Sequence, residues 1–204
     1  MRVAETRFAA IDFESAGSGP GRTDEPVQVA IVHLTGLKIS DALCSYVKPG
    51  IPVTWAARKV HGITDAMIRD APPFLALWPE IKAAMEGCWI IAHGAATEKR
   101  FLRAFPFHSF GPWVDTLVLA RAVYPNLSSH ALGDVIEALS LQNEPEIRAA
   151  GFRWHDARCD ALASLVLLRH LISVCELQDS EAGVLHLAGL DAYFTARKER
   201  SRPG

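Results

Sequence analysis

The chain has 204 residues, of which 50% are hydrophobic and 22% are charged. These proportions fit one globular domain with a substantial core, because a single domain takes about 100–200 residues. The formal net charge of −2 at pH 7 excludes the strongly basic class of proteins that hold nucleic acid mainly through its phosphates. A nucleic-acid partner would have to be bound at a local site.

From the sequence we expect neither a leader nor a membrane-spanning segment. No basic segment followed by a long apolar run opens the chain, and no apolar stretch approaches the ~20 residues that cross a bilayer. We therefore expect a cytoplasmic protein with no membrane partner. The cysteines form no C-x-x-C pair, so buried reduced thiols are the simplest expectation for Cys44, Cys88, Cys159 and Cys175.

The first third of the chain is predicted to start a sheet. Residues 7–13 form a short apolar run that ends in a glycine-rich segment, which indicates a buried strand followed by a loop. Two further strand-like runs, 27–34 and 42–48, are separated by a turn, so three antiparallel strands are expected. Residues 49–64 are expected to be loop or short helix.

The rest of the chain alternates between strands and helices, which is typical of α/β domains. We expect one domain over residues 1–204 with a core of about 7–175, followed at 179–204 by a C-terminal helix and a basic tail. Strands are expected at 88–93 and 114–116, and helices at 74–85, 95–104, 117–123, 130–140, 156–175 and 181–197.

Two acidic residues, Asp12 and Glu14, end the first predicted strand. The two-residue period of a strand points both side chains to one face and Phe13 to the other. Neighbouring carboxylates repel each other, so at least one is driven toward its protonated form unless a cation lies between them. A metal site is one interpretation, and the solvated edge of a loop is the other.

A histidine and an aspartate flank the start of the predicted helix 156–175. With Asp156 as the N-cap, Asp160 lies about one turn into the helix and can face the sheet. His155 then lies on the preceding loop, where it is free to approach a water molecule. Taken alone, this histidine is also explained as a surface residue.

Four segments together resemble the DEDDh 3′–5′ exonucleases, which include ribonuclease T and the epsilon proofreading subunit of bacterial replicative polymerase. They read AIDFESAG, KVHGIT at 59–64, IIAHGAATEKRFL at 90–102 and HDARCDA at 155–161. The resemblance covers about residues 7–175. It implies an α/β fold of the ribonuclease H-like type, with a mixed five-stranded sheet that starts antiparallel, continues with parallel strands and is flanked by helices.

The resemblance also implies a reaction, the two-metal hydrolysis of phosphodiester bonds at 3′ ends of single-stranded DNA or RNA. Asp12, Glu14 and Asp160 would hold two Mg²⁺ or Mn²⁺ ions through oxygen ligands. His155 would deprotonate the attacking water, for which an imidazole pKa of about 6.5 is suited.

The same resemblance assigns three residues to the substrate. The backbone around Ser15 and the side chain of His61 would contact the terminal nucleotide, and Phe13 would lie beside its base. A loop-capping role is the alternative for His61. Relatives of this kind can be dimeric, so a homodimer is possible.

One motif departs from the family pattern. Gly94, Thr97 and Glu98 stand where the family has an asparagine, an aromatic residue and an aspartate. Glutamate keeps the charge and adds one methylene, so Glu98 is expected to serve as the fourth ligand. A displacement of about 1 Å can cost on the order of a hundredfold in rate, so activity would be weak or tuned to an unusual substrate. An exposed helix residue is the alternative.

Two other functions stay open. A domain that has lost a ligand at Glu98 would act in nucleic-acid binding or protein docking without catalysis. A hydrolase of short oligonucleotides would use the same site and would fit the weak overall charge. No G-x-x-x-x-G-K-[ST] phosphate loop, G-x-S-x-G elbow or H-E-x-x-H helix is present to support other enzyme classes.

Overall fold

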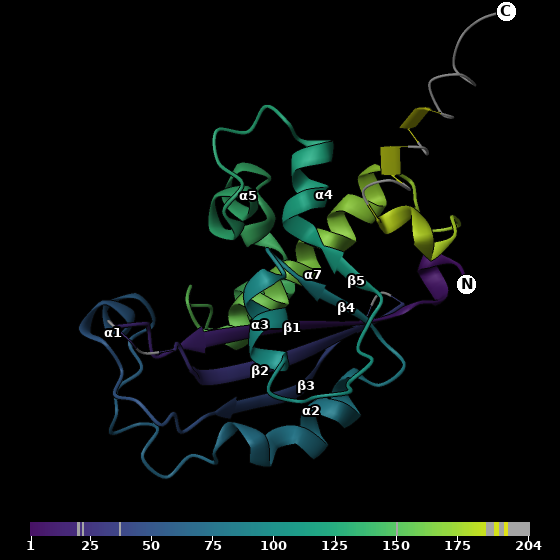
Figure 1. The fold of residues 1–204 in the computed structure, drawn as a ribbon. Coiled ribbons are helices and arrows are strands. Elements are labelled where there is room, and N and C mark those ends of the chain that lie inside the picture. The colour runs from purple at the N-terminus through teal and green to yellow at the C-terminus, as the bar shows by residue number, and fades with distance from the viewer. Residues whose placement is uncertain are drawn as a thin grey trace, which may run out of the picture.

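A mixed five-stranded sheet forms the centre of the molecule (Figure 1). The computed structural model describes residues 1–19, 21, 23–36, 38–149, 151–186, 190, 191, 194 and 195. The strand order is β3-β2-β1-β4-β5, with the first two pairings antiparallel and the last two parallel. The strands are β1 (Arg7–Ser15), β2 (Pro26–Thr35), β3 (Lys38–Tyr46), β4 (Trp89–Ala92) and β5 (Trp113–Asp115). The expected ribonuclease H-like sheet is confirmed.

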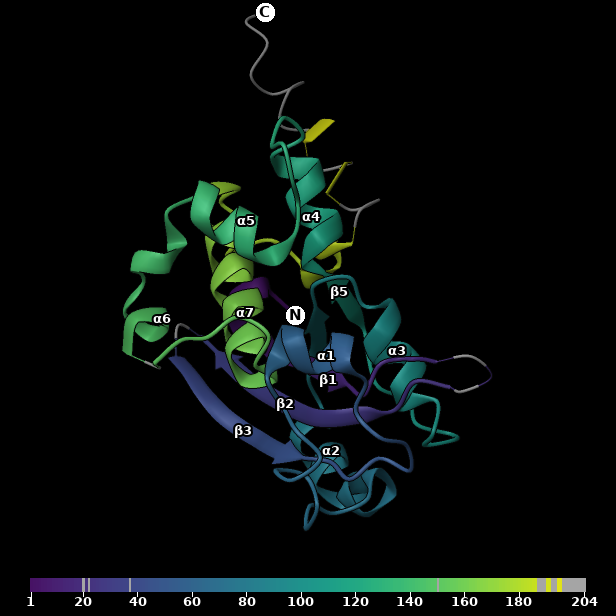
Figure 2. The same cartoon turned by 90° about the vertical axis from the view of Figure 1, so that its left-hand side faces the viewer.

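Helices cover both faces of this sheet (Figures 1 and 2). On one face lie α4 (Thr116–Val123), α5 (Leu132–Ala138) and the long α7 (Ala157–Val174), which crosses β1 and β2. On the other face lie α2 (Trp78–Met85) and α3 (Ala96–Leu102). The remaining helices are α1 (Trp55–His61) and α6 (Pro145–Ala149), and 3₁₀ turns span Val3–Glu5, Phe74–Leu77, Leu141–Asn143 and Ala182–Leu185.

Burial along β1 and β2 follows from this layering. β2 is buried on both faces from its start to Val32, as a strand between two helical layers must be. Alternate side chains of β1 point to opposite faces of the sheet. Phe8 and Ala10 belong to the apolar cluster with α7, whereas Ile11 and Phe13 belong to the cluster with α2 and α3. The alternation therefore directs Asp12 and Glu14 toward the α7 side.

Some boundaries differ from those expected. β3 begins at Lys38 rather than at residue 42, because this edge strand carries polar, mostly exposed residues that give no apolar signal. Of the helix expected at 181–197, the structure shows a 3₁₀ turn over Ala182–Leu185, and most later residues lie outside the described part. Cys44 is exposed, which corrects the expectation of burial, while the other three cysteines are buried.

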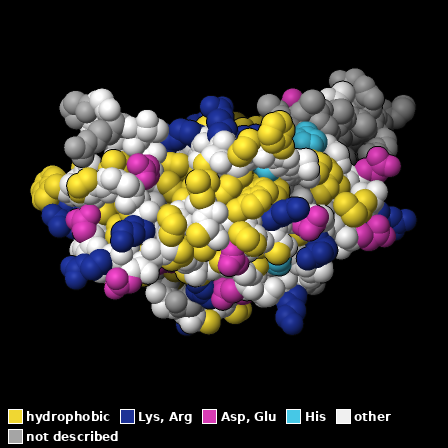
Figure 3. All heavy atoms as spheres, turned by 60° about the horizontal axis from the view of Figure 1, so that its bottom comes forward, with side chains coloured by type: hydrophobic (Ala, Val, Ile, Leu, Met, Phe, Trp, Pro, Cys, Tyr) yellow, Lys and Arg dark blue, Asp and Glu magenta, His cyan; other side chains and the backbone are white. Residues whose placement is uncertain are grey.

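The molecular surface carries both signs of charge. On the side that bears α2, hydrophobic side chains gather across the middle, with basic and acidic side chains scattered among them (Figure 3). This distribution agrees with the net charge of −2. Within the described ranges, no helix is both long and apolar enough to span a bilayer.

Candidate active site

The first part of the site is the end of β1. Asp12 pairs with Ala30 and Glu14 with Gln28, and the pairing of β1 with β2 shifts register between Glu14 and Ser15. Irregularities of this kind re-aim side chains at the rims of sheets. Asp12 and Glu14 are both partly buried on the face that carries α7, as the two-residue period predicts.

The second part is the beginning of α7. The Asp156 side chain caps the helix by accepting the N–H groups of Arg158 and Cys159, which confirms the predicted N-cap. Gln28 of β2, which is buried, fastens this end to the sheet. Its amide donates to Asp156 Oδ2 at 3.2 Å and accepts the N–H of Ala157 at 3.1 Å. The helix start is therefore fixed beside Glu14, the strand partner of Gln28.

The backbone conformation of His155 positions its side chain beside Glu14 and Asp160. Its φ of +60° lies in the left-handed region, which is costly for a residue with a side chain. Its N–H donates to Asp160 Oδ2 at 3.2 Å. Ligand atoms of Glu14, His155 and Asp160 all lie within 4.8 Å of one another. The exposed imidazole and two carboxylates thus form one cluster.

The third part is Glu98, in the first turn of α3. It is only 5% exposed, so the alternative of an exposed helix residue is wrong. After burial and the charge of Asp160, the negative charge of Glu98 is a further cause of the raised pKa of Asp12. Its Oε2 is buried and has no hydrogen-bond partner among the described residues. The structure therefore buries Glu98 at the start of α3 with one carboxylate oxygen left unsatisfied by the described residues.

The electrostatics of the site are those of crowded anions. Burial, then the charges of Asp160, Glu98, Glu14 and Asp156, raise the pKa of Asp12 well above its usual value. Burial is also the largest cause of the raised pKa of Glu14, about 8, and of Asp160 and Glu98, about 7 each. Without positive charge, the folded site therefore favours protonated carboxyls at neutral pH.

A divalent cation fits this environment. Glu98 Oε2 and Asp160 Oδ1 are buried without a hydrogen-bond partner in the described part of the chain, which is costly unless something else satisfies them. Carboxylate oxygens are the ligands that Mg²⁺ and Mn²⁺ prefer. A cation would satisfy both oxygens and offset the mutual repulsion of the acids.

The three expected substrate residues take different positions. His61 is buried; its Nδ1 accepts the N–H of Ile63 at 2.9 Å and its Nε2 donates to the carbonyl of Ser15 at 3.0 Å. These are the contacts of the loop-capping alternative. The ring of Phe13 is not brought to the carboxylates, because it packs against Phe74 and Phe101 under the other face of the sheet.

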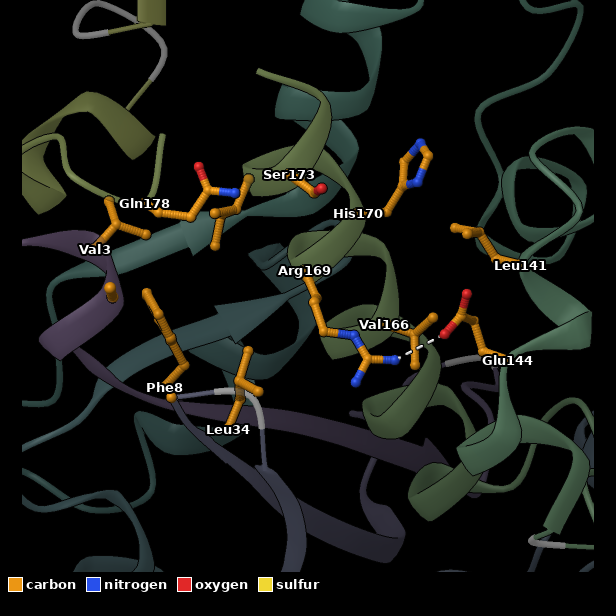
Figure 4. A pocket seen from close by; sticks show the side chains of 13 residues that line it. Val3, Phe8, Leu34, Leu141, Glu144, Val166, Arg169, His170, Ser173 and Gln178 are labelled. Carbon is orange, nitrogen blue, oxygen red and sulfur yellow. Dashed lines mark hydrogen bonds and ion pairs between the residues drawn. The ribbon is translucent and has the colours of Figure 1, made fainter. Parts of the chain in front are cut away.

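Two hollows of similar size lie in the described structure. One of about 530 Å³ adjoins the site and is lined by Trp154, His155 and Asp160 together with residues of α5. The other, also about 530 Å³, lies away from the carboxylates, against Phe8 and Leu34 (Figure 4). There the Arg169 guanidinium is held by Glu144 at 3.0 Å and by Glu146 at 2.6 Å.

Two residues that support the site are not among the predicted ones. Gln28 stands in the apolar run of β2, and an amide inside such a run is a signal for a specific buried contact. Asp115, at the end of β5, accepts the N–H groups of Gly94 and Ala95 before α3 and also that of Leu117 in α4. Its position after a short strand is the only sequence signal for this role.

Comparisons with known proteins agree with this geometry. The model of a family described as exonuclease matches residues 9–168. This chain belongs to the exonuclease family. The 3′-5′ exonuclease DinG of Bacillus subtilis is 26% identical over 171 residues, which are 81% of this chain and 18% of that protein. DNA polymerase III PolC-type of Thermotoga maritima is 29% identical over 188 residues, or 87% of this chain and 13% of the polymerase. The chain thus spans less than a fifth of the length of each of these two relatives.

Solved structures of exonucleases share the fold of this chain. Exonuclease X in complex with 5′ overhanging duplex DNA is 24% identical, with a TM-score of 0.67 over 88% of this chain and 99% of that one. The nuclease domain of 3′hExo, a DEDDh family member bound to rAMP, is 20% identical, with a TM-score of 0.71 over 89% and 99%. The expected membership of the exonuclease family is therefore confirmed by the family model, and the expected fold is confirmed by these structures.

Proposed function

We propose that this exonuclease-family chain removes nucleotides from the 3′ ends of single-stranded DNA or RNA in a metal-dependent reaction. The observation that carries the proposal is the cluster of Glu14, His155 and Asp160, together with the buried oxygens of Glu98 and Asp160 that lack a partner among the described residues. The charges of Asp160, Glu98 and Glu14 all raise the pKa of Asp12, which supports a shared site for the four carboxylates. Support comes from DinG, which is named a 3′-5′ exonuclease, and from exonuclease X, which was solved with DNA.

The four carboxylates would hold two Mg²⁺ or Mn²⁺ ions. Two such cations supply positive charge that stabilises both the attacking and the leaving oxygen of the phosphodiester. Asp12 and Glu14 hold their positions through the pairing of β1 with β2. Glu98 and Asp160 approach from the first turns of α3 and α7, so the site joins three separate elements.

His155 acts in this proposal as the general base. Its imidazole is exposed and clusters with Glu14 and Asp160, where the attacking water would be bound. The hydrogen bond from its N–H to Asp160 fixes the backbone of the loop that carries the ring. A histidine side chain is well suited to accept a proton from water near neutral pH.

The terminal nucleotide would lie against the end of β1. Ser15 contributes backbone groups there, and its carbonyl is already oriented by His61. We propose that His61 acts on the substrate through this contact, since both of its ring nitrogens are engaged. The Phe13 ring supports the strand from the opposite face, and its contact with a base stays a prediction.

The decisive experiment is digestion of a 5′-labelled single strand. The purified protein is expected to shorten it stepwise from the 3′ end with Mg²⁺ or Mn²⁺ and to stop when a chelator is added. Asp12→Asn, which keeps the size of the side chain, is expected to abolish the reaction. A protein that binds the strand but leaves it intact with either metal would instead support the docking function.

A further inference from the structure

Helix α1 is fastened beside the carboxylates at both of its ends. Thr54, its N-cap, donates its N–H to the carbonyl of Ala16 at 2.8 Å. His61, its last residue, binds the carbonyl of Ser15 at 3.0 Å. Both acceptors follow directly after Glu14, and Figures 1 and 2 show α1 next to the end of β1. The outer face of α1 therefore borders the active site.

That outer face carries a large aromatic side chain in solvent. Trp55 is 64% exposed and belongs to none of the apolar clusters of the described residues. Lys59, one turn later, places its Nζ 4.1 Å from the centre of the Trp55 ring. Val60 beside them is 54% exposed. Burial in the core does not explain a tryptophan at this position.

Positive charges run from this face toward the carboxylates. Arg58 and Lys59 are exposed and form no ion pair within the described residues. Arg153 lies beside the C-terminal end of α1. Its Nη1 is 3.7 Å from the position that a Cβ would occupy on Gly62, the C-cap of this helix. Its charge also lowers the pKa of Glu14, so it lies near the site. A local basic path thus joins Trp55 to the acidic cluster.

We propose that Trp55 and Lys59 bind the single-stranded segment of the substrate just 5′ of the nucleotide that is removed. A base stacks on the Trp55 ring, and Lys59 neutralises an adjacent phosphate. Aromatic side chains beside basic groups hold single strands in this way without reading sequence, because every base has a π face. The inference rests on the proposed exonuclease function and extends it to the substrate, which is an unpaired 3′ end longer than a dinucleotide.

The test compares Trp55→Ala and Trp55→Phe on an oligothymidylate 12-mer and on a thymidine dinucleotide. Stacking of one base is worth about tenfold or more in binding, so Trp55→Ala is expected to raise KM for the 12-mer about tenfold. The kcat value and the dinucleotide reaction should not change, and Trp55→Phe should retain most of the affinity.

Phe107→Ala is the matched control. Phe107 is also a fully exposed aromatic residue, but it lines a hollow with Glu86 and Gly87, which precede β4. Because β4 runs parallel to β1, this hollow lies at the end of the sheet opposite to Asp12 and Glu14. The control variant is expected to keep the parental KM for both substrates.

A binding measurement makes the result independent of turnover. Fluorescence anisotropy of the labelled 12-mer, recorded in chelator, should show the same tenfold loss for Trp55→Ala. Lys59→Gln should reduce the slope of log affinity against log salt by about 0.7, the value for one phosphate of a single strand. Unchanged affinity in Trp55→Ala, or an equal loss for a blunt duplex, would overturn the proposal. A parent protein that binds but does not cleave would count against the proposed function alone.

Discussion

Glu98 carries one methylene more than the aspartate that the family has at this position, so its carboxylate extends further from α3. The residue is buried in the first turn of α3, and its charge acts on Asp12, so the longer side chain is accommodated inside the site. Burying an ionised carboxylate without a partner is unfavourable, so the group either takes up a proton or is compensated by a charge of opposite sign. The cost of keeping Glu98 buried is therefore an argument for a cation at this position.

Substitutions at Glu98 test this directly. Glu98→Gln keeps the volume and removes the charge, so kcat/KM is expected to fall on the order of a hundredfold. Glu98→Asp should preserve or raise activity, because it restores the family's residue. Steady-state assays with Mn²⁺ measure both, and isothermal titration of Mn²⁺ reports binding separately. Parental activity in Glu98→Gln would place the residue outside the site.

The raised carboxyl pKa values predict how the metal-free protein responds to pH. Glu14 and Asp160 ionise near pH 8 and 7 when folded, against ordinary values of 4.5 and 3.8. Between about pH 4 and 8 the folded state therefore binds more protons than the unfolded state, and stability falls as pH rises. In chelator, Tm should drop from pH 5.5 to 8.5 by more than about 3 °C, the change that ~1 kcal/mol produces at this length.

Two further measurements check the origin of that decline. Mn²⁺ should raise Tm most at high pH, because the ions bind the deprotonated carboxylates. Glu14→Gln should flatten the pH dependence of Tm in chelator, since it removes a carboxyl group whose pKa is about 8 in the folded protein. A Tm that rises with pH in chelator would contradict the raised pKa values.

At the scale of elements, one carboxylate joins two helices. The start of α3 has no side-chain cap of its own. Asp115, at the end of β5, accepts the Gly94 and Ala95 N–H groups at 2.9 and 3.0 Å, and it caps α4 through Leu117. The position of Glu98 therefore depends on a residue of the neighbouring strand.

Asp115→Ala is expected to lower the free energy of unfolding by about 2 kcal/mol, since a lost cap costs about 1 kcal/mol and two helices are affected. It should also weaken Mn²⁺ binding through the displaced Glu98. Asp115→Asn is the matched variant, which can still accept two of the three N–H groups and should lose less. Urea denaturation measures the stability. Equal loss in the two variants would show that acceptor geometry is not the cause.

At the scale of the molecule, the distribution of charge restricts nucleic-acid binding to the surface around the site. The net charge is −2, and basic residues near the site include Arg58 and Lys59 of α1 and Arg153, whose charge lowers the pKa of Glu14. Arg100 likewise lowers the pKa of Glu98. A single domain over residues 1–204, a cytoplasmic location and a possible homodimer stay predictions. So does the choice among DNA, RNA and short oligonucleotides.

The small number of basic residues near the site predicts that kcat/KM depends only modestly on salt concentration. Three phosphate contacts at about 0.7 each give a slope of about −2 for log kcat/KM against log salt on a 12-mer. A dinucleotide, with one phosphate, should show a slope no steeper than about −0.7. Assays at constant Mg²⁺ over a range of KCl concentrations measure both slopes. A slope steeper than about −5 would show that a larger basic surface takes part.

Much of the fold and part of the site follow from local patterns. The five strands, the antiparallel start, the long apolar α7 and its Asp156 cap can all be predicted, because periodicity and capping depend on residues close in sequence. The paired orientation of Asp12 and Glu14 follows in the same way. The start of β3 could not be predicted, because an exposed edge strand carries no apolar run.

Sequence alone determined most of the strands and helices, the order of the motifs and the acidic and imidazole groups available for chemistry. The tertiary structure decided which of those groups meet. Gln28 fastens the start of α7 across a separation of 128 residues, and Asp115 holds the start of α3. The burial of Glu98 decides between the two interpretations of this residue that the sequence left open. Such contacts arise only when separate elements pack together, and no local periodicity encodes them.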